Sequence, residues 1–162
     1  MRQPPCAAKT GGKAGGKHEQ STALDILTPA GRSARMARVR QKNTKPEVRL
    51  RRWLHALGYR FRLHRKDLPG TPDIVLPKYR VALFVHGCFW HGHDCRAGRL
   101  PSTNTAFWEA KISANRSRDA AAVDCLRSQG WTPLVVWECD LRDRQGLEAR
   151  LVGEIAGAAS PD

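Results

Sequence analysis

Apolar residues recur at helical spacing after residue 44, and this pattern predicts a first helix with well-marked ends. Thr44 supplies an N-cap, and Glu47 completes a capping box, which is a sufficient structural explanation for that glutamate. Gly58 is typical of the residue that follows the last helical turn. The predicted buried stripe of this helix consists of Leu50, Trp53, Leu54 and Leu57.

Strand patterns and further helical patterns follow. Residues 59–63 alternate apolar with basic side chains, which predicts a half-exposed strand, whereas residues 81–85 are continuously apolar, as in a strand buried on both faces. Further strands are predicted at residues 74–76 and 131–138, and further helices at residues 107–129 and 141–156. This order of elements predicts an α/β domain with a short mixed sheet.

The two ends of the chain differ from this central part. Residues 1–22 are rich in Gly, Lys, Ala and Pro, which predicts a disordered basic arm over residues 1–27. We expect one domain over residues 28–157 and a tail at residues 158–162. Within this domain, residues 28–42 carry basic side chains at a spacing of three, which on its own indicates a solvated charged helix.

The charge of the chain indicates a polyanionic partner. The formal net charge is +13, and residues 1–22 hold only four Lys or Arg and one Glu, so most of the excess lies beyond them. Such a field favours phosphate polyanions through counterion release, and we expect a nucleic acid. No apolar run is long enough to span a bilayer, and no basic amphipathic helix with an aromatic face indicates membrane binding.

Five cysteines are expected to be reduced. The first residues lack the apolar core of a signal peptide, so we expect a cytoplasmic, reducing compartment. The cysteines are then metal ligands or buried thiols. Cys6 falls in the predicted arm and Cys125 in a helical pattern, so neither is assigned to a metal site.

Residues 86–95 hold three histidines, two cysteines and two adjacent large aromatics. Cys88, His93 and Cys95 form a ligand set that zinc prefers, and Cys139, after a predicted strand, is the candidate for a fourth ligand. The spacing matches no common zinc finger, so buried thiols with surface histidines are the alternative.

Asp73 precedes the strand at residues 74–76 and lies at the mouth of a predicted hairpin whose second strand ends at His86. A carboxylate there can hold a magnesium ion beside phosphate oxygens. Taken alone, an aspartate in a Pro-Gly turn is usually a turn residue. A basic protein, an acid before paired strands and a histidine cluster together indicate a nuclease.

Four runs of residues resemble the very-short-patch repair (Vsr) DNA mismatch endonucleases. They are PGTPD at residues 69–73, VHGCFWH at 85–91, FWEAKI at 107–112 and VWEC at 136–139. The resemblance covers roughly residues 28–145 and implies a restriction-endonuclease-like, three-layer α/β core with a structural zinc site. Pro72 and Asp73 match the first half of its PD…(D/E)xK signature, while Val85 and Gly87 replace the acid and the lysine, a departure that the family shares.

The resemblance also implies chemical roles. Asp73 and the carbonyl of Val85 would hold magnesium, and His91 would be the general base. His86 would assist at the scissile phosphate, with Glu47 and Asp119 as supporting acids. The zinc ligands would be Cys88, His93, Cys95 and Cys139.

The same match implies a wedge of aromatic side chains. Phe89, Trp90 and Trp108 correspond to residues that insert beside the mismatch, and Met36 to one that contacts DNA from the opposite groove. Residues 28–42 would therefore be a DNA clamp rather than a solvated helix.

We therefore expect a magnesium-dependent endonuclease that nicks one strand of duplex DNA beside a T·G mismatch left by deaminated 5-methylcytosine. It would act as a monomer at the bacterial nucleoid, with a companion cytosine methyltransferase and repair proteins. The alternatives are a nuclease of this fold that cuts another distortion, and a zinc-stabilised DNA-binding module without catalysis.

Overall fold

The structure, a computed structural model, describes residues 42–159. The predicted arm and nearly all of the predicted clamp, including Met36, lie outside these residues. The helices are α2 (Lys45–Ala56), α3 (Thr105–Ser128) and α4 (Arg144–Ala158), with short 3-10 turns η1 (Pro77–Tyr79), η2 (Arg96–Gly98) and η3 (Asp140–Arg142). The strands are β1 (Arg62–Leu63), β2 (Ile74–Leu76), β3 (Val81–His86) and β4 (Thr132–Trp137).

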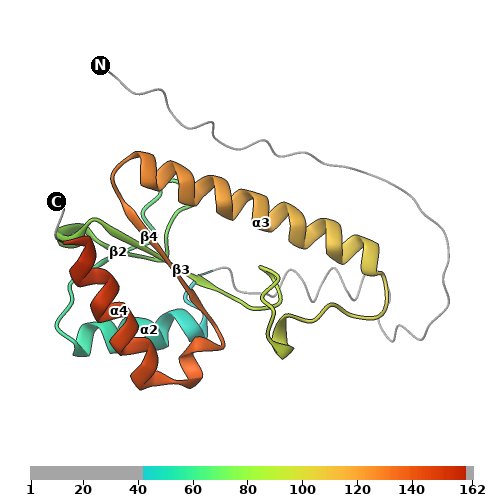
Figure 1. Ribbon diagram of the computed structural model, residues 1–162, viewed down its shortest axis with the longest axis horizontal. Coiled ribbons are helices and arrows are strands. Elements are labelled where there is room, and N and C mark those ends of the chain that lie inside the picture. Colours follow the sequence, from blue (N-terminus) through green and yellow to red (C-terminus); the bar gives the residue numbers. More distant parts are fainter. Residues whose placement is uncertain (1–41, 160–162) are drawn as a thin grey trace, which may run out of the picture. The chain divides into compact units, whose positions relative to one another are not determined.

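The four strands form one mixed sheet in the order β1-β2-β3-β4. β2 pairs antiparallel with β1 and β3, whereas β3 and β4 are parallel, with His86 opposite Trp137. The α3 helix makes the crossover between the two parallel strands (Figure 1). Because both strands end at the same edge, the segments that follow them meet there.

Helices cover both faces of the sheet. In Figure 1, α3 lies on one side of the strands and α2 and α4 lie on the other. Alternate strand residues serve the two faces, since Ile74 and Leu83 pack with α2 and α4, whereas Val75 and Phe84 pack with Leu126 of α3. This arrangement confirms the predicted α/β class and mixed sheet.

The first helix follows its predicted capping. The Thr44 side chain accepts a hydrogen bond from the Glu47 N–H, the Glu47 carboxylate accepts one from the Thr44 N–H, and Gly58 has a φ of +87°. The buried stripe consists of Leu50, Trp53 and Leu54, while Leu57 is exposed.

Several boundaries differ from the predictions. The strand expected at residues 59–63 is only Arg62–Leu63, and Tyr59 and Phe61 before it pack against the core. The α3 helix begins at Thr105, two residues before the expected start. The last helix begins at Arg144 rather than at residue 141, since the Asp143 side chain caps it by accepting from the Gly146 N–H.

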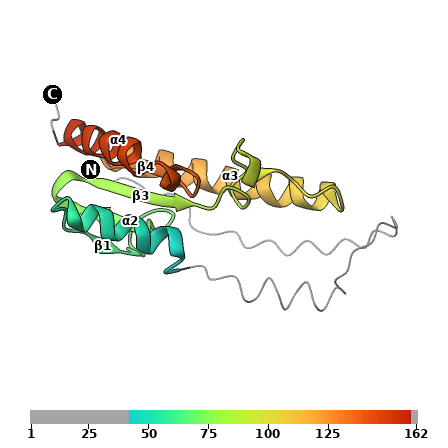
Figure 2. The same cartoon turned by 90° about the horizontal axis from the view of Figure 1, so that it is seen from below.

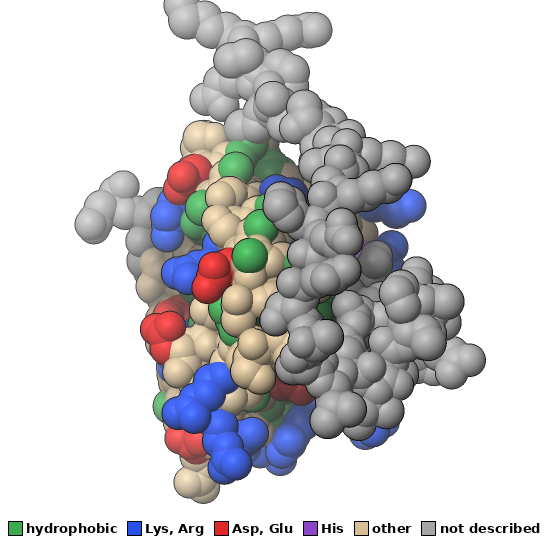
Figure 3. Space-filling view, turned by 90° about the vertical axis from the view of Figure 1, so that its right-hand side faces the viewer, with side chains coloured by type: hydrophobic (Ala, Val, Ile, Leu, Met, Phe, Trp, Pro, Cys, Tyr) green, Lys and Arg blue, Asp and Glu red, His purple; other side chains and the backbone are tan. Residues whose placement is uncertain are grey.

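The amino-terminal half of α3 extends past the ends of β3 and β4 (Figures 1 and 2). Of its 24 residues, only Ile112, Cys125 and Leu126 are buried. Figure 3 views the molecule from the side towards which this end of α3 points, and Lys and Arg side chains gather in one part of that face. Within residues 42–159, no helix has the length and apolar character needed to cross a bilayer.

Candidate active site and metal site

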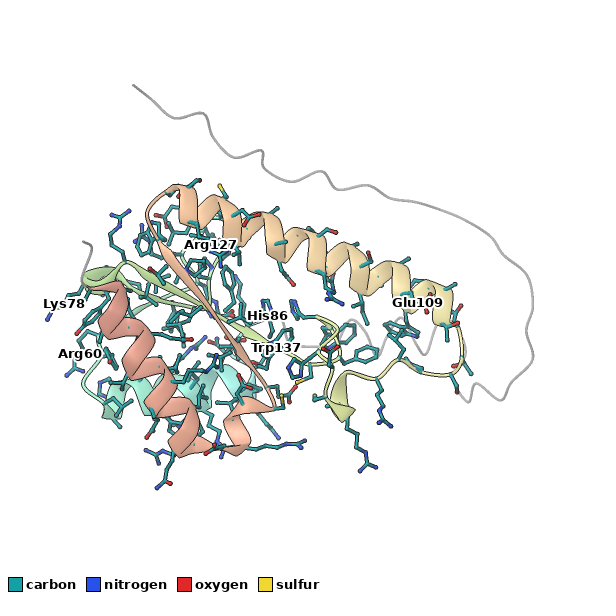
Figure 4. All side chains as sticks on the ribbon, viewed as in Figure 1. Arg60, Lys78, His86, Glu109, Arg127 and Trp137 are labelled. Carbon is teal, nitrogen blue, oxygen red and sulfur yellow. The ribbon has the colours of Figure 1, made fainter. Side chains whose placement is uncertain are left out.

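The site is built where the parallel strands end. β3 leads directly into the 86–95 segment, and Cys139 follows β4 by two residues. Figure 4 shows the side chains of His86 and Trp137 at these strand ends, and their ring centroids are 5.3 Å apart. The parallel pairing therefore brings residues separated by some fifty positions to one edge of the sheet.

The four predicted zinc ligands lie together. One ligand atom from each of Cys88, His93, Cys95 and Cys139 lies within 4.8 Å of the others. The Cys139 Sγ atom is 3.5 Å from His93 Nδ1. Zinc–sulfur and zinc–nitrogen bonds of ordinary length at a tetrahedral angle would separate two such atoms by about 3.6 Å. The cluster therefore fits a four-coordinate cation.

The thiols of this cluster differ in acidity. A hydrogen bond from His93 lowers the pKa of Cys95 to about 6. Burial raises the pKa of Cys139 to about 12 and also raises that of Cys88. A metal ion would have to displace protons from these two thiols, so metal binding is coupled to proton release.

Glycines shape the loop that carries the cluster. Gly92 has a φ of +66°, and a Cβ there would lie 2.6 Å from Cγ2 of Ile112. A Cβ on Gly98 would lie only 1.8 Å from the His93 carbonyl oxygen. The His93 N–H donates to the Cys88 carbonyl at 2.9 Å, which closes the turn around the ligands.

Two predicted catalytic histidines are stacked. The ring centroids of His86 and His91 are 3.8 Å apart, with an interplanar angle of 8°. Asp119 reaches from α3, with Oδ2 2.5 Å from His91 Nδ1. This contact fixes the proton on Nδ1 and leaves Nε2 of the neutral ring as an acceptor. Burial, followed by the neighbouring His91, lowers the pKa of His86 to about 4, so His86 is neutral at pH 7.

A hollow of about 310 Å³ opens beside this pair. Its walls include His86, His91 and Asp119, together with Arg116 of α3 and Trp137 of β4. The hollow therefore brings imidazole and guanidinium nitrogens together with the carboxylates of Asp94 and Asp119.

Asp73 lies on the hairpin beside β3, and its side chain is 20% exposed. Its Oδ2 atom accepts a hydrogen bond from the Val85 N–H at 2.8 Å. Burial raises the pKa of Asp73 to about 6, with the hydrogen bond from Val85 opposing the shift. A partly buried carboxyl group whose charged form is this unfavourable fits a neighbouring cation.

Glu47 is buried and lies behind Asp73 rather than facing open solvent. Between them is His64, with Nε2 3.7 Å from Glu47 Oε2 and Nδ1 3.8 Å from Asp73 Oδ1. The Arg51 guanidinium contacts both Glu47 and His64, at 2.6 and 3.0 Å. Neither Arg51 nor His64 was among the candidates from the sequence. The available signal was strand register, since the hairpin pairs Leu63 with Ile74 and so places His64 opposite Asp73.

The predicted wedge residues form one aromatic cluster. Phe89 contacts both Trp90 and Trp108 with ring centroids 5.1 Å apart, in edge-to-face geometry. Asn115 of α3 donates to the Trp90 carbonyl at 2.7 Å, which ties the loop to the helix. Phe107, which the sequence reasoning did not select, adds a fourth ring 5.2 Å from Trp108 and is 51% exposed.

Comparison with known proteins agrees with this geometry. A family model described as DNA mismatch endonuclease Vsr matches residues 24–97. The type II nicking enzyme V.XorIIP of Xanthomonas oryzae is 58% identical over 127 residues, covering 78% of this chain and 93% of that protein. The DNA mismatch endonuclease Vsr of Escherichia coli is 42% identical over 123 residues, covering 76% and 79%.

Among solved structures, the catalytic domain of the homing endonuclease I-Bth0305I is similar, with a TM-score of 0.51 at 19% identity. It covers 73% of this chain and 100% of that domain, and at this identity the likeness concerns the fold alone. The sequence relatives go further, because they are 58% and 42% identical to this chain over more than 120 residues. The chain belongs to the Vsr DNA mismatch endonuclease family and is a DNA endonuclease that hydrolyses phosphodiester bonds.

Proposed function

We propose that this endonuclease nicks one strand of duplex DNA beside a T·G mismatch, the product of 5-methylcytosine deamination. One observation carries the proposal: a single ten-residue loop holds part of the aromatic cluster, the stacked histidines and three of the four metal-cluster ligands. Recognition of a weakened base pair and hydrolysis of the adjacent phosphodiester would then be mechanically coupled.

The aromatic cluster suits a mismatch. Phe89, Trp90 and Trp108 are partly exposed and pack edge to face, so the group is rigid and carries flat apolar surfaces. Insertion of such side chains into a duplex requires unstacking of base pairs. A wobble pair is held less firmly than a matched pair, so insertion beside it costs less. The wedge of Phe89, Trp90 and Trp108 would therefore insert preferentially where the duplex is easily deformed.

The chemistry is assigned to the histidines and Asp73. His91, oriented by Asp119 through Nδ1, would take a proton from the attacking water at Nε2. His86, neutral and stacked on His91, would hydrogen-bond the phosphate. Asp73 and the Val85 carbonyl would hold magnesium, which when bound supplies positive charge that stabilises the transition state. Glu47 would act indirectly, through Arg51 and His64, which lie between it and Asp73.

Zinc is the proposed occupant of the Cys88, His93, Cys95 and Cys139 cluster. Sulfur and imidazole ligands favour zinc over magnesium, which prefers oxygen. Because these ligands join the loop to the end of β4, zinc would pin the wedge and His91 against the sheet.

Nicking at a defined sequence without a mismatch is the second candidate. Several relatives bear the name type II nicking enzyme, among them V.XorIIP and V.NmeAIP of Neisseria meningitidis. The non-catalytic DNA-binding module is set aside, because the family is one of endonucleases. A monomer and a companion cytosine methyltransferase remain part of the proposal.

The test is strand cleavage of end-labelled duplexes that differ only in one T·G or T·A pair, with magnesium or with EDTA. We expect magnesium-dependent nicking beside the mismatched T and little cutting of the T·A control. Equal nicking of both duplexes at one sequence would favour the site-specific alternative and reject mismatch recognition.

A further inference from the structure

A continuous row of charged and polar side chains lies behind Asp73. It runs from Glu47 to Arg51, then to His64 and finally to Asp73, with successive contacts of 2.6, 3.0 and 3.8 Å. The row joins helix α2 to the hairpin that presents Asp73. Only its two ends have been assigned a role so far.

Glu47 has little capacity left for a direct role. Its Oε1 atom accepts from the Thr44 hydroxyl at 2.9 Å and from the Thr44 N–H at 3.3 Å. Its Oε2 atom accepts from the Asn43 N–H at 3.0 Å and from Arg51 Nη2 at 2.6 Å. A carboxylate offers about four acceptor positions, so these four hydrogen bonds fill those of Glu47.

Arg51 determines which nitrogen of His64 carries the proton. A guanidinium group has only donors, so the 3.0 Å contact between Arg51 Nη2 and His64 Nε2 requires a lone pair on that nitrogen. The neutral ring must then carry its proton on Nδ1, the nitrogen that faces Asp73.

Nδ1 faces Oδ1 of Asp73, the carboxylate oxygen that does not accept the Val85 N–H. Oδ2 accepts from the Val85 N–H, whereas Oδ1 has no hydrogen-bond partner among residues 42–159. The 3.8 Å separation between Nδ1 and Oδ1 exceeds a hydrogen bond, so the donation to Asp73 argued below requires a side-chain rotation that closes this gap. The His64 backbone has a φ of +47°, and its N–H faces the Asp73 carbonyl, so this histidine occupies a constrained position.

We propose that His64 is a positioning residue for magnesium binding: its Nδ1–H, selected by Arg51, orients the Asp73 carboxylate towards the cation. The inference rests on the proposed role of Asp73 as a magnesium ligand. It assigns no metal–nitrogen bond to His64, because Nε2 accepts a hydrogen bond from Arg51 and Nδ1 carries the proton.

Two substitutions distinguish the roles of Nδ1 and Nε2 of His64. In His64→Asn the amide nitrogen can stand near the place of Nδ1, so the donor to Asp73 is kept. In His64→Gln the longer side chain reaches towards Arg51, and the donor to Asp73 is lost. His55→Asn, on the exposed last turn of α2, is the matched control.

The primary measurement is Mn²⁺ binding to the full-length, zinc-loaded protein by electron paramagnetic resonance. We expect the dissociation constant to stay within about threefold of wild type in His64→Asn and His55→Asn, and to rise about tenfold in His64→Gln, the scale of one hydrogen bond to a charged group. Equal affinities of the Asn and Gln variants would overturn the proposal. A directly bonded ¹⁴N coupling that disappears in both variants would make His64 a ligand instead.

The second measurement is the magnesium dependence of nicking. His64→Gln should raise the half-saturating magnesium concentration about tenfold and leave the rate at saturation within about threefold. A lowered saturated rate together with a lower melting temperature would indicate a structural role and reject positioning. If the wild type fails to discriminate T·G from T·A while the Mn²⁺ affinities follow the expected order, mismatch recognition fails and the role of His64 stands.

Discussion

The contact between Asp119 and His91 provides a direct test of the catalytic assignment. In Asp119→Asn the side chain keeps its size, but the amide nitrogen can donate where the carboxylate only accepts. When it donates to Nδ1 of His91, the ring proton moves to Nε2, and that nitrogen can no longer take a proton from water.

The size of the effect follows from the exposure of the pair. A general base contributes about 10²- to 10⁴-fold to a hydrolysis rate. The His91 and Asp119 side chains are 25% and 29% exposed, so water can partly replace the lost carboxylate. We therefore expect the single-turnover nicking rate of Asp119→Asn to fall about a hundred- to a thousand-fold.

The assay is single-turnover cleavage of a labelled T·G duplex at saturating magnesium, with DNA affinity measured in parallel. DNA affinity should stay within about twofold, since Asp119 has no proposed DNA contact. Asp124→Asn is the matched control on the same helix, because Asp124 is exposed and, within residues 42–159, forms an ion pair only with Arg127, at 3.6 Å. A nicking rate for Asp119→Asn within threefold of wild type would refute the assignment of His91 as an oriented base.

Three further predictions concern metal binding and stability. Cys139→Ala should abolish stoichiometric zinc in elemental analysis and lower the melting temperature, and a stable zinc-free variant would contradict the structural role. Because burial raises the pKa of Asp73 to about 6, protons should compete with magnesium for this carboxylate. The half-saturating magnesium concentration should rise about tenfold per pH unit below pH 6 and stay level above pH 7. A flat profile down to pH 5 would contradict this. Leu126→Ala, which removes a fully buried side chain between α3 and the sheet, should lower the free energy of unfolding by about 2–5 kcal/mol in urea titrations, and a loss below 1 kcal/mol would count against this packing.

Local sequence patterns predicted the parts of the fold that depend on local physics. The capping box at Thr44 and Glu47 begins α2 as expected, and the continuously apolar residues 81–85 form the central strand. Cys139 was selected because it follows a predicted buried strand, and it lies beside Cys88 and His93 as expected. The start of α4 was missed because a side-chain cap at Asp143 outweighed the apolar periodicity from residue 141.

The row behind Asp73 could not be read from periodicity. Arg51 occupies a helix position that resembles many solvated arginines, and His64 follows a short exposed strand. Their meeting depends on the register of β1 against β2 and on the angle at which α2 packs, and both are set by tertiary contacts. The wedge and clamp roles of Trp90 and Met36 stay predictions, and Met36 lies outside the described residues.

The most direct test of the central claim compares wild type with Trp90→Ala in single-turnover nicking of T·G and T·A duplexes. If one loop couples the wedge to hydrolysis, the wild type should prefer the mismatch strongly, and Trp90→Ala should lose most of that preference through slower cutting of the T·G duplex. Bound zinc should be unchanged, since Trp90 is not a ligand. An unchanged T·G to T·A rate ratio in a correctly folded variant would contradict the account.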